Sequence, residues 1–213
     1  MRKTKIIATL GPSSFDLDII SELIKNGMDV ARINMSHFDE KIDLFKFINH
    51  IRSESKNINR AVSILFDLCG PKIRVDSLEN NSIQIEEGKK YTLGNSKCDI
   101  PLNIAISFRE HDSDGVVKVD DGSISFNILE VGNNKLILKA NNDGKIISGK
   151  GVNFPGVKLD LPALTEKDKK DLKLAVELDA DWIAMSFVRS AKDYNIIKSE
   201  LSKISSNIPV IAK

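Results

Sequence analysis

This sequence contains little cysteine, no long hydrophobic run and no excess of charge of either sign. The two cysteines, Cys69 and Cys98, lie far apart without a CxxC pair, which argues against a zinc site or a disulfide framework and favours a reducing cytosol. No segment approaches the roughly 20 apolar residues of a membrane helix, and the N-terminal apolar run is too short for a signal peptide. The net charge of +1, without a Lys/Arg block, gives no reason to expect nucleic acid. We therefore expect a cytoplasmic protein that binds neither membranes nor nucleic acid.

What is present is typical of a folded globular chain. Of the 213 residues, 41% are hydrophobic and 29% are charged, which argues against disorder and is enough for one large or two small domains. No internal repeat or low-complexity tract interrupts the chain.

Strand-like and helix-like segments alternate at both ends of the sequence. Short apolar runs predict strands at 4–11, 28–37, 60–68, 181–188 and 209–213. Apolar residues at helical spacing predict helices at 15–27, 40–55, 166–178 and after Ser190. Because apolar strands alternating with helices are typical of a parallel sheet covered on its faces, we predict an α/β fold.

Several residues mark the expected helix ends. Gly27 stands where a C′ glycine belongs, Thr165 with Asp168 resembles a capping box, and Ser190 is expected to cap the last helix. The apolar stripe of the helix at 40–55 is interpreted as Leu44, Phe45, Ile48 and Ile51.

The middle of the chain follows a different pattern. Between about 71 and 161 no helix-length stripe occurs, and short alternating runs are separated by Gly, Asn and Asp clusters, which predicts an antiparallel β domain inserted after the third strand. We therefore predict a barrel-type domain in two parts, 1–70 and 162–213, with an insert at 71–161.

Residues 144–150 match the first seven positions of a P-loop. We reject that motif, because Gly151 replaces its Ser or Thr and neither a strand before it nor a helix after it is predicted.

Polar residues gather where the predicted parallel strands end. Arg32, Asn34 and Ser36 share one face of the second strand, Asp67 ends the third, and Lys213 ends the fifth. The fourth strand ends near Ser186, Phe187 and Arg189. These residues either simply end the strands or form a site for an anion with a cation nearby, since the carboxyl ends of such strands are where sites form.

Positive charges also flank the predicted insert. Lys72 and Arg74 follow Asp67 along the chain, and Lys150 lies among glycines where the insert returns. His37 follows the second strand, and we expect it to lie beside a ligand. We expect the insert to close as a lid over a ligand that carries phosphate, with Arg74 and Lys150 on the lid.

Together these stretches resemble one known family. The motifs TKIIATLGPSS, ARINMSH, DLCGPKIR, VDDG, KGVNFPG, LPALTEKD and SFVRSAKD occur in the order and spacing of pyruvate kinases and cover the whole chain. The resemblance implies the N-terminal part of a (β/α)8 TIM barrel with a small antiparallel β-barrel inserted after strand 3. It also implies phosphoryl transfer from phosphoenolpyruvate to ADP, giving pyruvate and ATP in glycolysis, by an enzyme expected to be a homotetramer.

The resemblance also implies roles for individual residues. Lys213 aligns with the catalytic lysine and Arg32 would hold the transferring phosphate, so both bind substrate. The residues implied to bind nucleotide are Asn34, His37, Arg74 and Lys150. The residues implied to line a monovalent-cation site for K⁺ are Asn34, Ser36, Asp67 and the carbonyl of Leu68.

Two departures from the family pattern carry further expectations. Lys72 and Leu68 stand where potassium-dependent members carry Glu and Thr, so we expect the Lys72 ammonium to make K⁺ dispensable. The implied Mg²⁺ ligands, a Glu and an Asp, fall beyond residue 213, so we expect the 213-residue chain alone to be an inactive fragment.

Two other functions stay open at this stage. One is another barrel enzyme that handles phosphoenolpyruvate or pyruvate, although a lyase of the citrate-lyase type lacks the insert. The other is a non-catalytic phosphate- or nucleotide-binding protein that keeps Arg32, Arg74 and Lys150.

Overall fold

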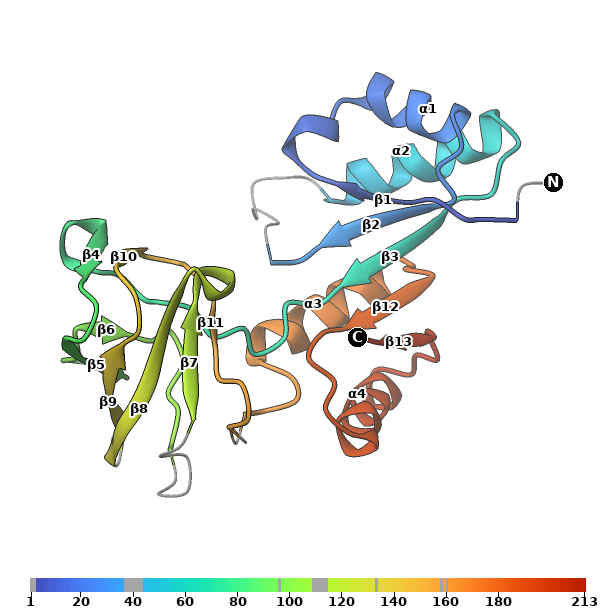
Figure 1. The fold of residues 1–213 in the computed structure, drawn as a ribbon. Helices are drawn as coiled ribbons and strands as arrows, with labels where there is room; N and C mark the ends of the chain where they lie inside the picture. Colours follow the sequence, from blue (N-terminus) through green and yellow to red (C-terminus); the bar gives the residue numbers. More distant parts are fainter. Residues whose placement is uncertain are drawn as a thin grey trace. The chain divides into compact units, whose positions relative to one another are not determined.

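The chain folds into two compact units. A computed structural model describes residues 3–36, 44–95, 97–108, 115–132, 134–157, 159 and 161–213. One unit comprises Met1–Gly70 with Ala163–Lys213, and the other comprises Pro71–Pro162 (Figure 1). Each unit has its own hydrophobic core. Within the described ranges, no helix combines the length and the apolar character that crossing a membrane requires.

The first unit is built on a five-stranded sheet in the order β1-β2-β3-β12-β13. Its strands are β1 (Ile7–Leu10), β2 (Val30–Asn34), β3 (Ser63–Asp67), β12 (Trp182–Met185) and β13 (Val210–Ala212). All neighbouring strands are parallel. Each strand lies beside the one that precedes it in this unit, as in a barrel, whereas the strand order of a doubly wound sheet reverses. The predicted start of a (β/α)8 barrel is confirmed.

Helices connect these strands. They are α1 (Leu17–Lys25), α2 (Leu44–Asn57), α3 (Glu166–Glu177) and α4 (Ala191–Lys203), with a short 3₁₀ turn η1 (Pro12–Ser14) before α1. The C-terminus of α1 ends as predicted at Gly27, whose φ is 116°. The amide of Gly27 donates to Ile24 and that of Met28 donates to Leu23, at 3.1 and 2.9 Å, which is the Schellman arrangement.

The apolar stripe of α2 differs from the predicted one in a single residue. Phe45 is 64% exposed, whereas Phe47 is 4% exposed and packs edge-on against Phe15 with ring centroids 4.9 Å apart. The buried side chains of this helix are Leu44, Phe47, Ile48 and Ile51. That set follows the i, i+3, i+4, i+7 spacing, and a residue one step after Leu44 is rotated about 100° away from the core. The predicted residues 40–43 of this helix lie outside the described range.

The second unit is a β structure, as predicted for the insert after β3. A six-stranded sheet has the order β11-β7-β8-β9-β5-β6, and β10 pairs with β4 in a separate ribbon. Every pairing is antiparallel except that of β5 with β6. The strands are β4 (Ser82–Ile85), β5 (Lys90–Gly94), β6 (Ile100–Pro101), β7 (Val116–Val119), β8 (Ile124–Gly132), β9 (Lys135–Ala140), β10 (Gly144–Ile147) and β11 (Val152–Asn153), with 3₁₀ turns η2 (Glu79–Asn81) and η4 (Asp120–Gly122).

Candidate active site

The carboxyl ends of the parallel strands bring the predicted polar residues of the first unit to one edge of the sheet. Arg32 and Asn34 lie on the face of β2 opposite to the buried Ala31 and Ile33, as the alternation predicts. Asn34 pairs in register with Asp67 on β3. Residues from several segments of the chain therefore meet at this edge.

Asp67 is the centre of the cluster. Its side chain is 2% exposed and accepts hydrogen bonds from Nε and Nη2 of Arg32 at 2.8 and 2.5 Å. The Nζ of Lys213 lies 3.2 Å from each of its carboxylate oxygens. A buried carboxylate needs such partners, because an unpaired buried charge is strongly destabilising. Two cations beside one carboxylate leave a surplus positive charge, which suits an anionic ligand.

Thr9 is a member of the cluster that the sequence did not reveal. Arg32 and Thr9 lie opposite each other in the β1–β2 register, and Nη1 of the arginine donates to the threonine hydroxyl at 2.6 Å. The guanidinium is thus held from two strands, by Thr9 on β1 and by Asp67 on β3. Only the strand register reveals this partner, because Thr9 lies within an apolar run with no polar pattern of its own.

Lys213 is held at this edge by its backbone. Its amide donates to the carbonyl of Met185 at 3.0 Å, and its carbonyl accepts from the amide of Val188 at 2.9 Å. Its side chain remains 53% exposed while it contacts Asp67. The ammonium group therefore combines a fixed backbone anchor with access to solvent.

Ser186 links the ends of β3 and β12. Its hydroxyl donates to the carbonyl of Leu68 at 2.6 Å and lies 3.3 Å from Oδ1 of Asp67. The side chain of Leu68 is buried in the core, so its backbone carbonyl is the part that faces the cluster. That carbonyl keeps a second lone pair beside the one that Ser186 uses.

The predicted monovalent-cation residues offer a set of hard oxygen donors. Asn34 and Asp67 are register neighbours, and Oδ1 of Asn34 accepts from the amide of Ser36 at 3.1 Å. With the Leu68 carbonyl, these groups are carboxylate, amide, hydroxyl and carbonyl oxygens, the kind that hard cations prefer, so the donor chemistry fits such an ion. Within the described part of the chain, no group of three or more His, Cys, Asp or Glu residues is placed to hold a metal.

Arg189 does not join the cluster in the way that its position after β12 suggested. It pairs with Asp193, whose Oδ2 accepts from the Arg189 amide at 2.9 Å and from its Nε at 3.3 Å. Ser190 occupies the N-cap of α4, but its side chain makes no capping bond. Burial would raise the pKa of Asp193, but the hydrogen bonds and the charge of Arg189 outweigh it and hold this pKa below its usual value. The side-chain cap predicted for Ser190 is therefore absent, and the Asp193 carboxylate binds the amide of Arg189, which precedes the helix.

Two predicted phosphate contacts lie close together within the second unit. Arg74 forms an isolated antiparallel bridge with Gly151 and donates from Nη1 to the carbonyl of Gly149 at 2.7 Å. Lys150, between those glycines, pairs with Asp120 at 2.9 Å. Both cations therefore belong to two segments of the chain that lie side by side. Lys72 is half-buried in the same unit. His37 lies outside the described residues.

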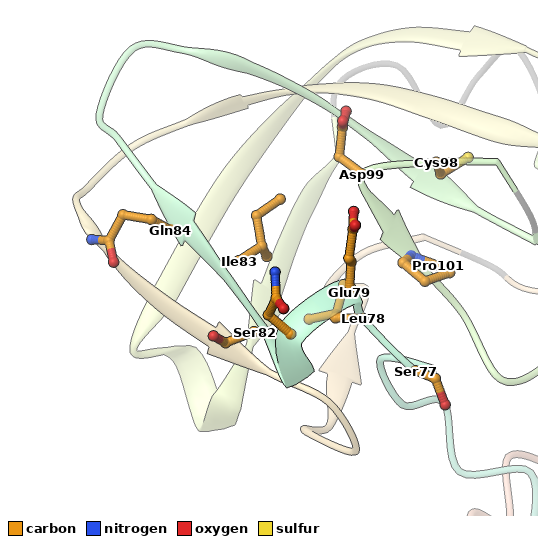
Figure 2. Close-up of a pocket in the computed structure, with 10 residues that line it drawn as sticks. Ser77, Leu78, Glu79, Ser82, Ile83, Gln84, Cys98, Asp99 and Pro101 are labelled. Atoms are coloured by element: carbon orange, nitrogen blue, oxygen red, sulfur yellow. The ribbon is translucent and has the colours of Figure 1, made fainter.

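The second unit also carries a pocket that none of these residues lines. Its volume is about 480 Å³, and its lining residues are drawn in Figure 2. One of the two carboxylates that line it, Asp99, accepts hydrogen bonds from the amide and the hydroxyl of Thr92 at 2.7 and 2.8 Å.

The segment rejected as a P-loop begins with β10, which pairs with β4 instead of leading into a helix.

Comparisons with known proteins point to one family. A family model described as "Pyruvate kinase, barrel domain" matches residues 1–213. A pyruvate kinase from Clostridium perfringens is 37% identical over the whole of this chain, which covers 46% of that relative. A pyruvate kinase from Geobacillus stearothermophilus is also 37% identical over the whole chain, which covers 37% of its length.

A solved structure agrees with these relatives. The crystal structure of a pyruvate kinase from Cryptosporidium parvum superimposes with a TM-score of 0.88 at 32% sequence identity. The match covers 99% of this chain and 46% of that structure. The chain therefore spans less than half the length of the relatives that it matches.

Proposed function

Because the chain belongs to the pyruvate kinase family, we propose that its residues serve phosphoryl transfer from phosphoenolpyruvate to ADP, which gives pyruvate and ATP. The observation that carries the proposal is the Asp67 cluster, where Arg32 and Lys213 from two other strands meet one buried carboxylate. We further propose that this step belongs to glycolysis in the cytoplasm and that the complete enzyme is a homotetramer.

Arg32 and Lys213 are the proposed catalytic and substrate-binding residues. Phosphoryl transfer depends on positioning and on stabilising charge more than on covalent help from the protein. Arg32 is oriented by Thr9 and Asp67, so its guanidinium is preorganised to bind the oxygens of the transferring phosphoryl group. The solvent-accessible ammonium of Lys213 would neutralise negative charge on that group during transfer.

The proposed cation residues are Asn34, Ser36, Asp67 and the carbonyl of Leu68. A monovalent cation held there would add positive charge beside the phosphoryl group. We propose that the Lys72 ammonium supplies this charge instead, so that K⁺ is dispensable. Mg²⁺ would bind the phosphate oxygens, through ligands that the resemblance assigns to residues beyond 213.

The second unit, which we propose acts as a lid at about residues 71–161, would carry the nucleotide. Arg74 and Lys150 are the proposed phosphate contacts, together with Asn34 and His37 from the first unit. The closeness of Arg74 to the Lys150 segment supports the proposal, because Arg74 binds the carbonyl of Gly149 and bridges Gly151, the two neighbours of Lys150.

The experiment measures ATP formation from phosphoenolpyruvate and ADP by the complete natural protein that contains these residues. We expect activity in the wild type and a loss of about 100-fold or more in kcat for Arg32→Met and for Lys213→Met. Lys25→Met, at an exposed pair with Glu22, is the control and should keep wild-type activity. Phosphate or nucleotide binding without any turnover would favour the non-catalytic alternative.

A further inference from the structure

The first turn of α3 reaches the loop that follows β3. Asp168 lies in this turn and is fully buried, at 0% exposed. Its Oδ1 accepts from the amide of Gly70 at 3.0 Å, across 98 positions of sequence. Its Oδ2 accepts from the amide and the hydroxyl of Thr165 at 2.8 and 2.7 Å, which completes the predicted capping box. The carboxylate therefore binds the helix start with one oxygen and the loop with the other.

Gly70 occupies a position that only glycine fits. Its φ is +68°, and a Cβ there would lie 2.8 Å from Cδ2 of Phe187 and 3.1 Å from the carbonyl of Ser186. The loop is therefore packed tightly against the residues that follow β12. A side chain at position 168 that pushed on Gly70 would press this backbone toward Ser186 and Phe187.

The same loop carries residues of the candidate active site. The amide of Leu68 donates to Ala184 at 2.9 Å, and the Leu68 carbonyl accepts from Ser186 at 2.6 Å. The Asp168 bond to Gly70 adds a third anchor at the far end of the loop. Asp67 is the last residue of β3, paired with Asn34 and Ala184, and the three anchors hold the backbone that follows directly after it.

The neighbour of Asp168 makes a parallel contact with the turn after β2. Lys167 donates from Nζ to the carbonyl of Met35 at 2.9 Å and to Asp171 at 2.5 Å. Burial raises the pKa of Asp171, although the hydrogen bond and charge of Lys167 act in the opposite direction. The amide of Met35 in turn donates to the carbonyl of Asp67 at 3.0 Å. One helix turn thus holds the two loops that meet at Asp67.

A capping role alone does not account for this carboxylate. The third position of a capping box is commonly Glu or Gln, and a neutral amide can serve there. Complete burial of a charge is unfavourable unless every oxygen is used. Both oxygens of Asp168 are used, and one of them by an amide outside the helix.

We propose that Asp168 is a positioning residue for the reaction: its carboxylate holds the Gly70 end of the loop that begins at Asp67, and so keeps Asp67 aligned with Arg32. This inference rests on the proposed function. Asp168→Asn tests it, because an amide has one acceptor oxygen and cannot bind Gly70 and Thr165 together. Thr165→Ala is the matched control, since it removes the capping hydroxyl and leaves the bond to Gly70 intact.

The two variants are compared in the complete natural protein by kinetics and thermal unfolding. We expect both to lower the melting temperature, but only Asp168→Asn to lower kcat, by about 10-fold or more, with KM values within about 3-fold of wild type. Equal kcat in the two variants would overturn the proposal. If Asp168→Asn does not fold, Asp168→Glu replaces it; its longer side chain displaces Gly70 and should lower kcat in the same way.

A second measurement separates this inference from the proposed function. Absence of transfer in the wild type would refute the proposed function. The anchoring of the loop would still be read from hydrogen exchange at the Gly70 amide. We expect exchange to be about 10-fold faster or more in Asp168→Asn and nearly unchanged in Thr165→Ala. Unchanged exchange in Asp168→Asn would refute the anchoring.

Discussion

Nε and Nη2 of Arg32 donate to the same carboxylate oxygen of Asp67, a residue 35 positions further along the chain. The two residues lie on adjacent parallel strands, two positions out of register, and Thr9 binds the third guanidinium nitrogen. The hydrogen bonds to Asp67 and Thr9 therefore set the orientation of the guanidinium group before a ligand binds. Preorganisation of this kind is what a phosphoryl-transfer site needs.

Removal of the Asp67 charge should damage both stability and catalysis. Asp67→Asn leaves the cations of Arg32 and Lys213 without their partner, so we expect a loss of about 1–3 kcal/mol in the free energy of unfolding and about 100-fold in kcat. Urea unfolding and a coupled ATP assay measure the two effects. The control is Asp179→Asn, an exposed position with φ 53° that Asn tolerates well. A fully active Asp67→Asn enzyme would contradict the role given to this carboxylate.

A methyl group at Gly70 should destabilise the first unit. Gly70→Ala combines an unfavourable positive φ with contacts of 2.8 and 3.1 Å to Phe187 and Ser186, so we expect a loss of about 1–3 kcal/mol in the free energy of unfolding. Gly11→Ala is the control in the same unit, because nothing lies within 4 Å of its added Cβ. Chemical denaturation compares the two, and equal stability in both variants would count against the packing argument.

The ion pair at the start of α4 should make stability depend on pH in acid. The folded-state pKa of Asp193 is lowered, so its contribution is fully present above the unfolded pKa of about 3.9 and is lost as the pH falls through the lower folded value. We expect Asp193→Asn to lose about 1 kcal/mol at pH 7, the usual size for an acid at a helix N-terminus. The difference from wild type should shrink below about pH 4. A difference of the same size at pH 7 and pH 3 would argue against this linkage.

Potassium should have little effect on turnover. If the Lys72 ammonium supplies the positive charge of the cation site, replacing K⁺ by a bulky inert cation such as tetramethylammonium should leave kcat within about 2-fold at constant ionic strength. Lys72→Met should then become stimulated by K⁺, because the site regains a need for the ion. Strong K⁺ stimulation of the wild type would exclude the substitution of charge that we propose.

Much of the fold could be predicted because it rests on local periodicity. The β/α alternation, the insert after β3, the glycine at the end of α1 and the capping box at Thr165 all depend on residues a few positions apart. One member of the α2 stripe was wrong: Phe45 and Phe47 are equally apolar, but Phe47 has the i+3 spacing from Leu44 and is the buried one.

The candidate site divides in the same way. By itself the sequence determined that Arg32, Asp67 and Lys213 lie at or near the ends of parallel strands, and parallel strands place their carboxyl ends along one edge. Only the tertiary structure decided that Thr9 binds Arg32, that Arg189 turns to Asp193, and that Asp168 reaches Gly70. The pair of Arg189 and Asp193 is local and depends on the direction of the side chains at the start of α4. The other two pairings depend on strand register and on contacts between distant segments. Such contacts arise when the whole chain packs, so no short stretch of sequence encodes them.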